Sequence, residues 1–513
     1  MTAFRLTAYL TLTLLVLPSL ASAQAFDGLT LVNNMNSTTM KLIDNSGATV
    51  KSWTCNTNVA YVPYLMPDST IWRPSVYSGA TMRGAAYGGL IQHYSWNGSI
   101  IESFIWSNSY HQQHHDIHPM PNGHVLVVSW DRKTAAEAQA MGRQNITSDI
   151  WPDEVIEWDP VSRTVVWEWH FWDHLIQDVD PSKPNYGVVR EHPELLDINL
   201  GTVQGGDWMH CNTVDYNAER DEIILTSHNL HEIYVIDHST TTEEARGHTG
   251  GRHGKGGDIL YRWGNPQNYD RGTSADRVFY IVHGGNWIRP GMPGAGNIIV
   301  LNNGDRPGSA NDYSVIIEIT PPLDSNDHYY IHPDSAFGPT PQNLTWSYSN
   351  GSAFYAQHLG GAYRLPNGNT MATLGTVNKL VEVTYNKQVA WQYNTGGQIG
   401  RALKYPRNFT GIRSERTEPV ASTLNISPNP FRNAASIRYK LDARSQVELS
   451  VLDVVGRLVA SFDKGVQDPG EHSIAFAPRP DLPAGVYLVR LTAAARDGSG
   501  SIVTSQERLV KGR

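Results

Sequence analysis

The sequence predicts an all-β protein, a six-bladed β-propeller followed by a small C-terminal Ig-like β-sandwich. Three observations favour this fold class. Only 17% of the 513 residues are charged, while 45 Gly, 29 Pro, 15 Trp and 24 Tyr supply turns and strand-forming aromatics. A two-part hairpin pattern recurs along most of the chain, and the pattern changes near Leu424. Such a composition is typical of many short strands joined by tight turns, and it disfavours a helical protein.

The first part of the repeat is an apolar run, a turn and a second apolar run. Asn-Gly turns supply the positive φ angles that two-residue hairpins need. Two copies, His118–Val128 and Tyr363–Met371, turn at Pro-Asn-Gly, and looser copies occur at Tyr64–Ile71, Asn212–Leu225 and Ile288–Val300. Each copy therefore predicts one β-hairpin.

The second part of the repeat is a strand, a polar turn and a strand that carries tryptophan. Copies of this part end near Trp169, Trp263 and Trp391, and weaker ones at Trp53, Trp106 and Trp346. Two successive hairpins form a four-stranded unit that cannot bury both faces alone, so the units must stack, and radial stacking gives a propeller.

The chain contains six copies of the second hairpin of the repeat but only five copies of the first, so one blade lacks half of its strands. We expect the segment Tyr405–Ile412 to supply the missing half by closing on the N-terminal strands, which gives six blades within residues 24–415. A β-sandwich array would not need this mismatch. The long insertions Phe171–Gly201 and Thr240–Gly257 are expected to be loops at one end of the ring.

The N-terminal segment has the pattern of a signal peptide over residues 1–23. Arg5 precedes a mostly apolar stretch from Leu6 to Leu20, and Ala21-Ser22-Ala23 gives a small-x-small cleavage pattern. The alternative is a buried core strand. No other segment approaches the roughly 20 apolar residues that span a bilayer. We therefore expect a soluble, exported mature protein with no transmembrane segment.

The net charge argues against a nucleic-acid partner, and the cysteine usage argues against a disulfide framework. The net charge of −9 gives no electrostatic reason to expect a nucleic acid. Cys55 and Cys211 lie far apart in sequence and lack metal-ligand spacing, so they form no disulfide framework and are expected to be small buried residues.

Residues 424–513 follow a predicted linker at 416–423 and show alternating short strands typical of a small antiparallel sandwich. Pro428-Asn429-Pro430-Phe431, Asp453–Arg457 and Leu482–Tyr487 resemble the C-terminal sorting domain of type IX secretion cargo. That resemblance implies the type IX machinery as a partner and a location outside a diderm cell, secreted or on the outer-membrane surface. The alternative is an Ig-like module without a sorting role.

Histidines recur at equivalent places in the repeat. His115, His210 and His283 each stand at the start of a first hairpin in a different blade, and His358 stands slightly earlier in its blade. His228 follows the strand at Ile223–Leu225 and is expected near the same rim. Equivalent positions in a closed ring face one centre, so we expect these imidazoles to converge. A single histidine at a strand end more often bonds a neighbouring backbone group.

The chemistry of converging histidines fits an anionic, tetrahedral substrate group. Neutral imidazole is a nucleophile and imidazolium donates hydrogen bonds to anions. One ring attacks the central atom while the others stabilise its oxygens. Composition does not distinguish sulfuryl from phosphoryl transfer. The run from His111 to His115 lacks a supporting Asp, Glu or Cys pattern, so no metal site is expected.

The segment Asp207–Tyr216, with Asp221–Ser227 after it, resembles the signature of the arylsulfate sulfotransferases, and the likeness covers Phe26–Tyr393. It implies a six-bladed propeller that needs no nucleotide donor or other cofactor. A phenolic sulfate gives its sulfuryl group to a histidine, and a phenolic acceptor then takes it. By position, the resemblance implies His283 as the nucleophile and His115, His210 and Asn212 as groups that hold the sulfate oxygens. We therefore predict His283, His115 and His210 as catalytic residues. With the repeat positions of the other histidines, we predict Asn212, His228 and His358 as substrate-binding residues.

Two departures from that family accompany the resemblance. The family pattern Gln-His-x-Ala-Arg around the nucleophile is Val282-His283-Gly284-Gly285-Asn286 here, and the arginine after Ser-Ser is His228. The second change removes a permanent cation and a bidentate donor, so activity is expected to depend more on pH. Two alternatives stay open: a non-catalytic surface propeller that binds sulfated or aromatic ligands, and a metal-dependent hydrolase.

Overall fold

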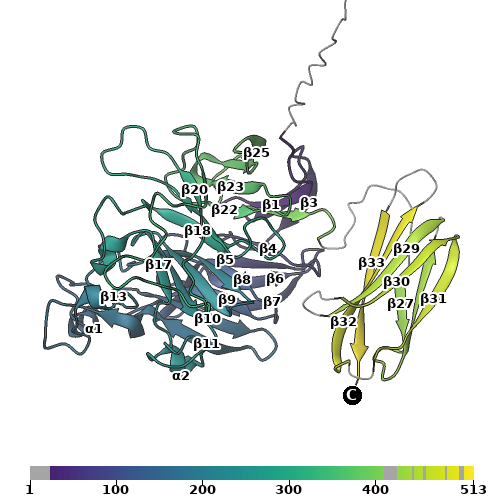
Figure 1. Cartoon of the computed structure of the whole chain (residues 1–513), viewed down its shortest axis with the longest axis horizontal. Helices are drawn as coiled ribbons and strands as arrows, with labels where there is room; N and C mark the ends of the chain where they lie inside the picture. The colour runs from purple at the N-terminus through teal and green to yellow at the C-terminus, as the bar shows by residue number, and fades with distance from the viewer. Residues whose placement is uncertain are drawn as a thin grey trace, which may run out of the picture.

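The structure is a computed structural model, and it describes residues 23–409, 424–441, 444–453, 458–479, 482–495 and 502–512. The predicted linker, the predicted signal peptide apart from its last residue, and the end of the Tyr405–Ile412 segment lie outside the described residues. Nearly all regular structure is β (Figure 1). The α-helices of the described residues are short: α1 (Ala135–Ala140) and α2 (Thr242–Ala245).

Within residues 23–409, six four-stranded antiparallel sheets follow one another along the chain. The first three contain β26 (Leu403–Pro406), β1 (Gly28–Asn33), β2 (Thr39–Ile43) and β3 (Thr49–Thr54); β4 (Tyr64–Leu65), β5 (Ile71–Val76), β6 (Gly89–Tyr94) and β7 (Ile100–Ile105); and β8 (His111–Pro119), β9 (Val125–Asp131), β10 (Asp153–Asp159) and β11 (Thr164–His170).

The next three sheets have the same order of strands. They contain β14 (Cys211–Asn217), β15 (Glu222–Ser227), β16 (Glu232–Asp237) and β17 (Tyr261–Trp263); β18 (Val282–Trp287), β19 (Ile298–Asn302), β20 (Val315–Ile319) and β21 (Trp346–Tyr348); and β22 (Gly361–Arg364), β23 (Thr370–Leu374), β24 (Lys379–Val383) and β25 (Val389–Asn394).

The two sequence patterns correspond to the two halves of a sheet. The Pro-Asn-Gly turns connect β8 to β9 and β22 to β23. The tryptophan patterns fall in the last strand of a sheet, or directly after it in the case of Trp106, which follows β7. The alternation of apolar runs with turn residues thus predicts the hairpins correctly, because both signals are local.

The end of this unit pairs with its beginning. β26 is antiparallel to β1, with Gly28 opposite Pro406 and Leu31 opposite Leu403, so the predicted closure by the segment near Tyr405 is confirmed over these residues. Lys404 Nζ lies 2.7 Å from Glu382 Oε2 of β24, and the Tyr405 hydroxyl accepts a hydrogen bond from the Leu65 amide. One strand therefore ties the first sheet to the second and the sixth.

Apolar clusters fill the spaces between successive sheets. Sheets one and two share a cluster around Trp53 and Ile71, and further clusters join two to three, three to four, four to five and five to six. A sixth cluster joins Val32 and Ile43 of the first sheet to Met371 and Leu380 of the sixth. Each sheet thus buries both faces against its neighbours, as stacked repeats require.

The two long insertions contain short elements as well as loop. The first holds the 3₁₀-helices η1 (Phe171–His174) and η2 (Val189–Glu191) and the parallel pair β12 (Leu175–Ile176) and β13 (Leu196–Asp197); the second holds α2. Another 3₁₀-helix, η3 (Pro266–Tyr269), follows β17, and η4 (Gly375–Val377) follows β23. Cys55 and Cys211 are buried, as predicted, and both are free thiols.

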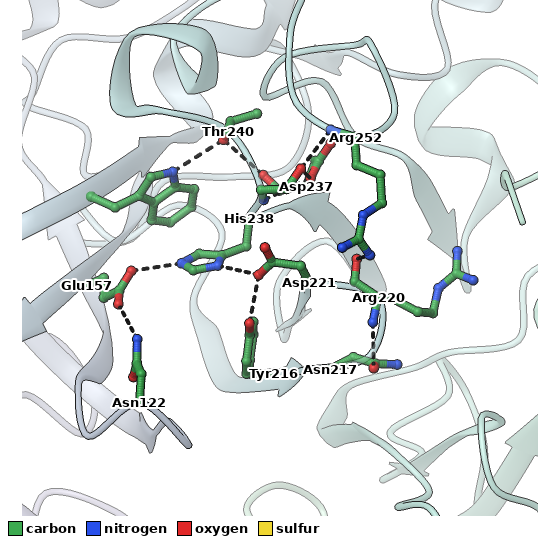
Figure 2. Close-up of polar contacts among 12 residues, drawn as sticks. Asn122, Glu157, Tyr216, Asn217, Arg220, Asp221, Asp237, His238, Thr240 and Arg252 are labelled. Carbon is green, nitrogen blue, oxygen red and sulfur yellow. Dashed lines mark hydrogen bonds and ion pairs between the residues drawn. The ribbon is translucent and has the colours of Figure 1, made fainter. Parts of the chain in front are cut away.

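A charged histidine links the third and fourth sheets. Figure 2 shows His238 between two carboxylates: its Nε2 lies 2.9 Å from Glu157 Oε2, and its Nδ1 lies 2.7 Å from Asp221 Oδ1. Burial opposes charge on His238, but the hydrogen bonds to Asp221 and Glu157 outweigh burial and raise its pKa to about 9. The imidazolium is therefore a cross-link between sheets.

The C-terminal described residues form two further antiparallel sheets that enclose one apolar core. Val447 and Leu449 of one sheet pack there with Ile437 and Phe476 of the other. The strands are β27 (Leu424–Ser427), β28 (Ala435–Leu441), β29 (Ser445–Asp453), β30 (Leu458–Gln467), β31 (Gly470–Phe476), β32 (Gly485–Ala495) and β33 (Ile502–Lys511).

Candidate functional site

Five histidines from four sheets converge. His115 lies in β8, His210 directly precedes β14, His228 directly follows β15, His283 lies in β18, and His358 precedes β22. The ring centroids of His115 and His210 are 4.5 Å apart, those of His210 and His228 4.8 Å, and those of His228 and His283 5.5 Å. His358, which is exposed, influences the titration of both His228 and His283. The structure thus brings together every histidine that the sequence singled out.

The backbone near three of these histidines departs from regular strand. The register shifts between Gln113 and Ile117 in the β8–β9 pair, and at matching places between β14 and β15 and between β18 and β19. His115 and His210 have positive φ angles of 51° and 57°. Irregularities of this kind re-aim side chains and are common beside active sites. They turn imidazoles of different sheets toward one another.

The irregular part of β18 needs small residues. A Cβ atom at Gly284, where φ is +73°, would lie 2.5 Å from the Gly361 Cα atom of the next sheet, and one at Gly285 would lie 2.6 Å from Thr226 Oγ1. The Gly284 and Gly285 amides donate to the hydroxyls of Thr213 and Thr226. The glycines that distinguish this sequence from the family pattern therefore allow three sheets to approach closely around His283.

The neighbours of His283 fix its tautomer. Asn303 Nδ2 donates to the carbonyls of Ala356 and Leu359, so Asn303 Oδ1 faces His283 Nδ1, at 2.7 Å. An amide oxygen only accepts, so Nδ1 carries the proton and the lone pair is on Nε2. The Leu359 amide, 3.3 Å from Nε2, donates to that lone pair. His283 Nε2 is therefore the nucleophilic atom of this ring.

His210 is paired with a carboxylate. Its Nδ1 lies 2.5 Å from Asp207 Oδ2, and the indole of Trp130 donates to the other oxygen of Asp207. Burial opposes the charge of Asp207, but the hydrogen bond from His210 prevails and lowers its pKa. An ionised carboxylate orients the imidazole and stabilises its protonated form, as in an acid–base dyad.

His115 is held by a second histidine. Its Nδ1 lies 2.8 Å from His114 Nδ1, and His114 Nε2 lies 2.8 Å from Asp153 Oδ1, although outside hydrogen-bond alignment. The carboxylate favours the proton of His114 on Nε2, so His114 Nδ1 accepts and His115 Nδ1 donates. The remaining lone pair of His115 is then on Nε2. Tyr61, which the sequence did not single out, packs edge-on against His115 at 5.3 Å.

Three histidines of this cluster, His115, His228 and His283, are held neutral by burial and by their neighbours. Burial first, and the neighbouring His210 next, lower the pKa of His228 to about 3 and that of His115 well below its usual value. Burial and His228 lower the pKa of His283 in the same way. A bound tetrahedral anion would oppose the mutual repulsion of the imidazolium rings and raise these pKa values, because a nearby negative charge stabilises imidazolium. The unliganded cluster is therefore prepared to take up protons together with an anion.

Asn212 lies behind the cluster. It is fully buried, its Nδ2 donates to the Val282 carbonyl at 2.7 Å, and its Oδ1 accepts from the Thr213 hydroxyl. These bonds hold the strand that presents His283. Contact with a substrate, as the sequence predicts for Asn212, stays a prediction.

The supporting carboxylates expected to be missing around His111 are present. Asp131 and Glu154, from β9 and β10, lie with His111 in a group whose potential ligand atoms are within 4.8 Å of one another. Sequence spacing did not predict this, because strand pairing brings these residues together. Lys133 and His170 also form ion pairs with Asp131, and His170 forms one with Glu154. Positively charged side chains therefore already balance the negative charge of the two carboxylates.

Comparison with known families follows the two parts of the chain. The arylsulfotransferase (ASST) family model matches residues 19–246, and the secretion system C-terminal sorting domain model matches residues 425–505. The first range includes His115, His210, Asn212 and His228, and it ends before His283. No curated protein matches the chain.

Solved structures resemble the chain only distantly. A protein of unknown function from Bacteroides caccae has 10% identity and a TM-score of 0.41, over 74% of this chain and 99% of its own. The nidogen/laminin complex gives 7% identity and a TM-score of 0.38, over 73% and 97%. CopC from Methylosinus trichosporium OB3b gives 24% and 0.15, over 18% and 93%. None of these likenesses indicates an activity.

The sorting domain indicates an exported protein that is secreted or held at the cell surface. Among the described residues, no helix has both the length and the apolar character needed to cross a bilayer. The chain therefore matches the arylsulfotransferase (ASST) family model over residues 19–246 and the secretion system C-terminal sorting domain model over residues 425–505, in the order that its motifs predict.

Proposed function

We propose that this protein transfers a sulfuryl group from a phenolic sulfate ester to a phenolic acceptor, without a nucleotide donor, through a sulfohistidine at His283. The family match supports sulfuryl transfer in general. The observation that carries the mechanism is the arrangement around His283, whose Nε2 lone pair faces the Leu359 amide while Asn303 holds the Nδ1 proton.

The six sheets of residues 28–406 form one closed six-bladed propeller in this proposal, and the C-terminal pair of sheets forms an Ig-like sandwich. Closure is supported by the β1–β26 pairing and by the apolar cluster between the first and sixth sheets. A ring places the first strands of its blades around one axis. This explains why histidines from β8, β18 and the segments before β14 and β22 come together.

In the first half-reaction, His283 Nε2 attacks the sulfur atom of the aryl sulfate. A nitrogen–sulfur bond forms, and the bond from sulfur to the aryl oxygen breaks with its electron pair going to that oxygen. His210, protonated and paired with Asp207, gives a proton to the leaving phenolate. The products are a free phenol and sulfated His283.

In the second half-reaction, the acceptor phenol gives its proton to the now neutral His210, and its oxygen attacks the same sulfur. The nitrogen–sulfur bond breaks, and its electron pair returns to His283 Nε2. Both histidines are restored, so neither half-reaction consumes a cofactor. His115 and His228 donate to sulfuryl oxygens when the bound anion raises their pKa values from the low values of the free protein.

Access to the nucleophile depends on the segment 356–360. The side chain of His283 is only 1% exposed, and Leu359, with a positive φ of 62°, lies over its Nε2. Displacement of this segment frees both the lone pair and the Leu359 amide, which then donates to the sulfuryl group. Exposed His358 is the first histidine of the cluster that an arriving substrate meets.

The test is turnover of 4-nitrophenyl sulfate with and without an acceptor phenol. The proposal expects acceptor-dependent release of 4-nitrophenol, a sulfated peptide containing His283 when the acceptor is omitted, and loss of both in His283→Asn. The exposed residue His332 offers a matched control, since His332→Ala leaves the cluster unchanged. Full turnover in His283→Asn contradicts the mechanism. Binding of aryl sulfates without turnover, and unchanged in His283→Asn, supports the binding propeller instead.

A further inference from the structure

The Gly/His-rich insertion at residues 240–257 has no part in the proposed sulfuryl transfer, yet it brings three potential metal ligands together. His174 of η1 lies in the other long insertion, and Asp258 directly follows this one. Their ligand atoms and that of His248 all lie within 4.8 Å of one another. His174 Nδ1 is 3.0 Å from Asp258 Oδ1, and His248 Nδ1 is 2.7 Å from the same oxygen.

Both ring nitrogens of His174 face oxygen atoms. His174 Nε2 lies 2.9 Å from the Ala245 carbonyl, which only accepts, so Nε2 carries a proton. The other ring nitrogen, Nδ1, faces Asp258 Oδ1 at 3.0 Å. The side chain of His174 is fully buried, so water does not separate them. Either an added proton or a metal cation is needed between these atoms.

The local packing holds His174 in this orientation. Trp169 stacks on its ring with centroids 5.5 Å apart, and the Trp169 indole donates to the Gly257 carbonyl. A Cβ atom at Gly257 would lie 2.0 Å from the Ala245 oxygen and 2.6 Å from His174 Nε2, so only glycine permits this approach. An imidazole whose far nitrogen donates to a backbone carbonyl is the usual second-shell arrangement of a metal-bound histidine.

The group around His111 makes a useful contrast. There His111 Nδ1 and His170 Nδ1 face carboxylates, Lys133 adds a further positive charge, and the pKa values of both histidines are raised. Burial opposes this rise, and the hydrogen bonds to Glu154 and Asp131 outweigh it. In that group the imidazole nitrogens can donate hydrogen bonds to the carboxylates that they face, so protonation of the histidines is enough to balance the carboxylate charge.

We propose that His174, His248 and Asp258 bind a zinc ion that fastens the Gly/His-rich insertion to η1. Zinc takes imidazole nitrogen and carboxylate oxygen at about 2.0–2.2 Å in tetrahedral geometry, which separates the ligand atoms by about 3.3 Å. The present spacings need only small adjustments, and His248, with 59% of its side chain exposed, can supply them. Solvent fills the fourth position on that exposed side.

The experiment measures zinc binding to the untagged, chelator-treated chain by calorimetry and by elemental analysis. We expect about one zinc per chain in the wild type, and at least about 100-fold weaker binding in His248→Ala and in Asp258→Asn. His192→Ala is the matched control, because His192 is a partly exposed histidine of the neighbouring insertion that pairs with Glu194. It should bind zinc as the wild type does.

Two further readouts are independent of sulfotransferase activity. Saturating zinc should raise Tm by about 3 °C at a hundred times Kd, and it should protect the exposed Lys255 from trypsin. Neither effect should occur in His248→Ala. No zinc binding by the wild type, or equal binding by His248→Ala, overturns the proposal and leaves a proton between His174 and Asp258.

Discussion

At the scale of single residues, the partner of one ring nitrogen decides what the other nitrogen can do. Asn303 holds the Nδ1 proton of His283 and leaves its lone pair on Nε2, whereas the Nδ1 atom of His210 faces the carboxylate of Asp207. These different partners are the reason that the proposed mechanism gives two residues of the same type different roles, a nucleophile and an acid–base group.

The variant Asp207→Asn tests the role of His210. The neutral amide no longer stabilises imidazolium, so protonation of the leaving phenol suffers, and we expect turnover to fall about 10²-fold for esters of poorly acidic phenols. Esters of acidic phenols such as 4-nitrophenol leave without a proton and should be affected much less. Turnover of a series of aryl sulfates measures this dependence. A uniform loss across the series would show that Asp207 acts only on the fold.

The low pKa of His228 leads to a prediction of how the affinity for an aryl sulfate depends on pH. A pKa of about 3 in the free protein makes His228 neutral between pH 5 and 8, so using it as a cationic donor takes up a proton from solvent. Affinity for an aryl sulfate should therefore fall as pH rises, by up to about tenfold per pH unit. Titration of inactive His283→Asn with the ester at several pH values measures the slope.

The matched variant is His228→Arg, which supplies the permanent cation of the family pattern. It should bind the ester more tightly near pH 8 and with a flatter pH dependence. An unchanged slope in His228→Arg contradicts the role given to His228.

At the scale of secondary structure, the irregular places in the first strands are what turn regular hairpins into a site. Gly284 is one such place, since a methyl group there meets the backbone at Gly361. We expect Gly284→Ala to destabilise the protein by about 1–3 kcal/mol more than Gly291→Ala does. Gly291 has a similar φ of +81° with no atom near its Cβ position, so it reports backbone strain alone.

Urea unfolding of both glycine variants measures the difference. Gly284→Ala should also lose turnover, because β18 carries His283. Equal stability of the two variants would mean that the close approach of β18 to the sixth sheet is not required for folding.

The cross-link that His238 forms between the third and fourth sheets should make the stability of the protein depend on pH. The folded pKa of His238, about 9, exceeds the unfolded value of 6.5, so its contribution is fully present below pH 6.5 and is lost as pH rises through 9. We expect the free energy of unfolding to fall by up to about 3 kcal/mol across this interval. Urea unfolding from pH 6 to 9.5 measures it, and the same decline in His238→Gln would assign it to other groups.

At the scale of the whole molecule, β26 is the element on which closure of the proposed propeller depends. A chain that ends at Phe409 keeps this strand, whereas one that ends at Gly400 exposes the edge of β1 and leaves buried Glu382 without Lys404. Breaking such a buried pair costs about 3–5 kcal/mol. We expect the longer chain to unfold cooperatively in a thermal scan and the shorter one to be rapidly digested by protease. Equal resistance of both chains would remove β26 from the closure.

The sequence predicts those parts of the fold that depend on residues close together in the chain or on their position in the repeat. Apolar runs around Asn-Gly turns predict the hairpins, and the repeat position of His115, His210 and His283 predicts that they converge. The register shifts beside them depend on the opposite strand, so no local pattern predicts them. His174 and His248 come from two insertions that lie outside the repeat and meet at Asp258, and Tyr61 reaches His115 from a connecting segment.

The β1–β26 pairing has a consequence for the order in which the chain acquires its structure. Gly28 and Pro406 come from opposite ends of the larger unit, so a chain that emerges from a ribosome or a translocation pore residue by residue cannot finish its first sheet until nearly the whole unit has emerged. Until then β1 presents an open hydrogen-bonding edge, and during export this is the interval in which a holding chaperone has most to protect.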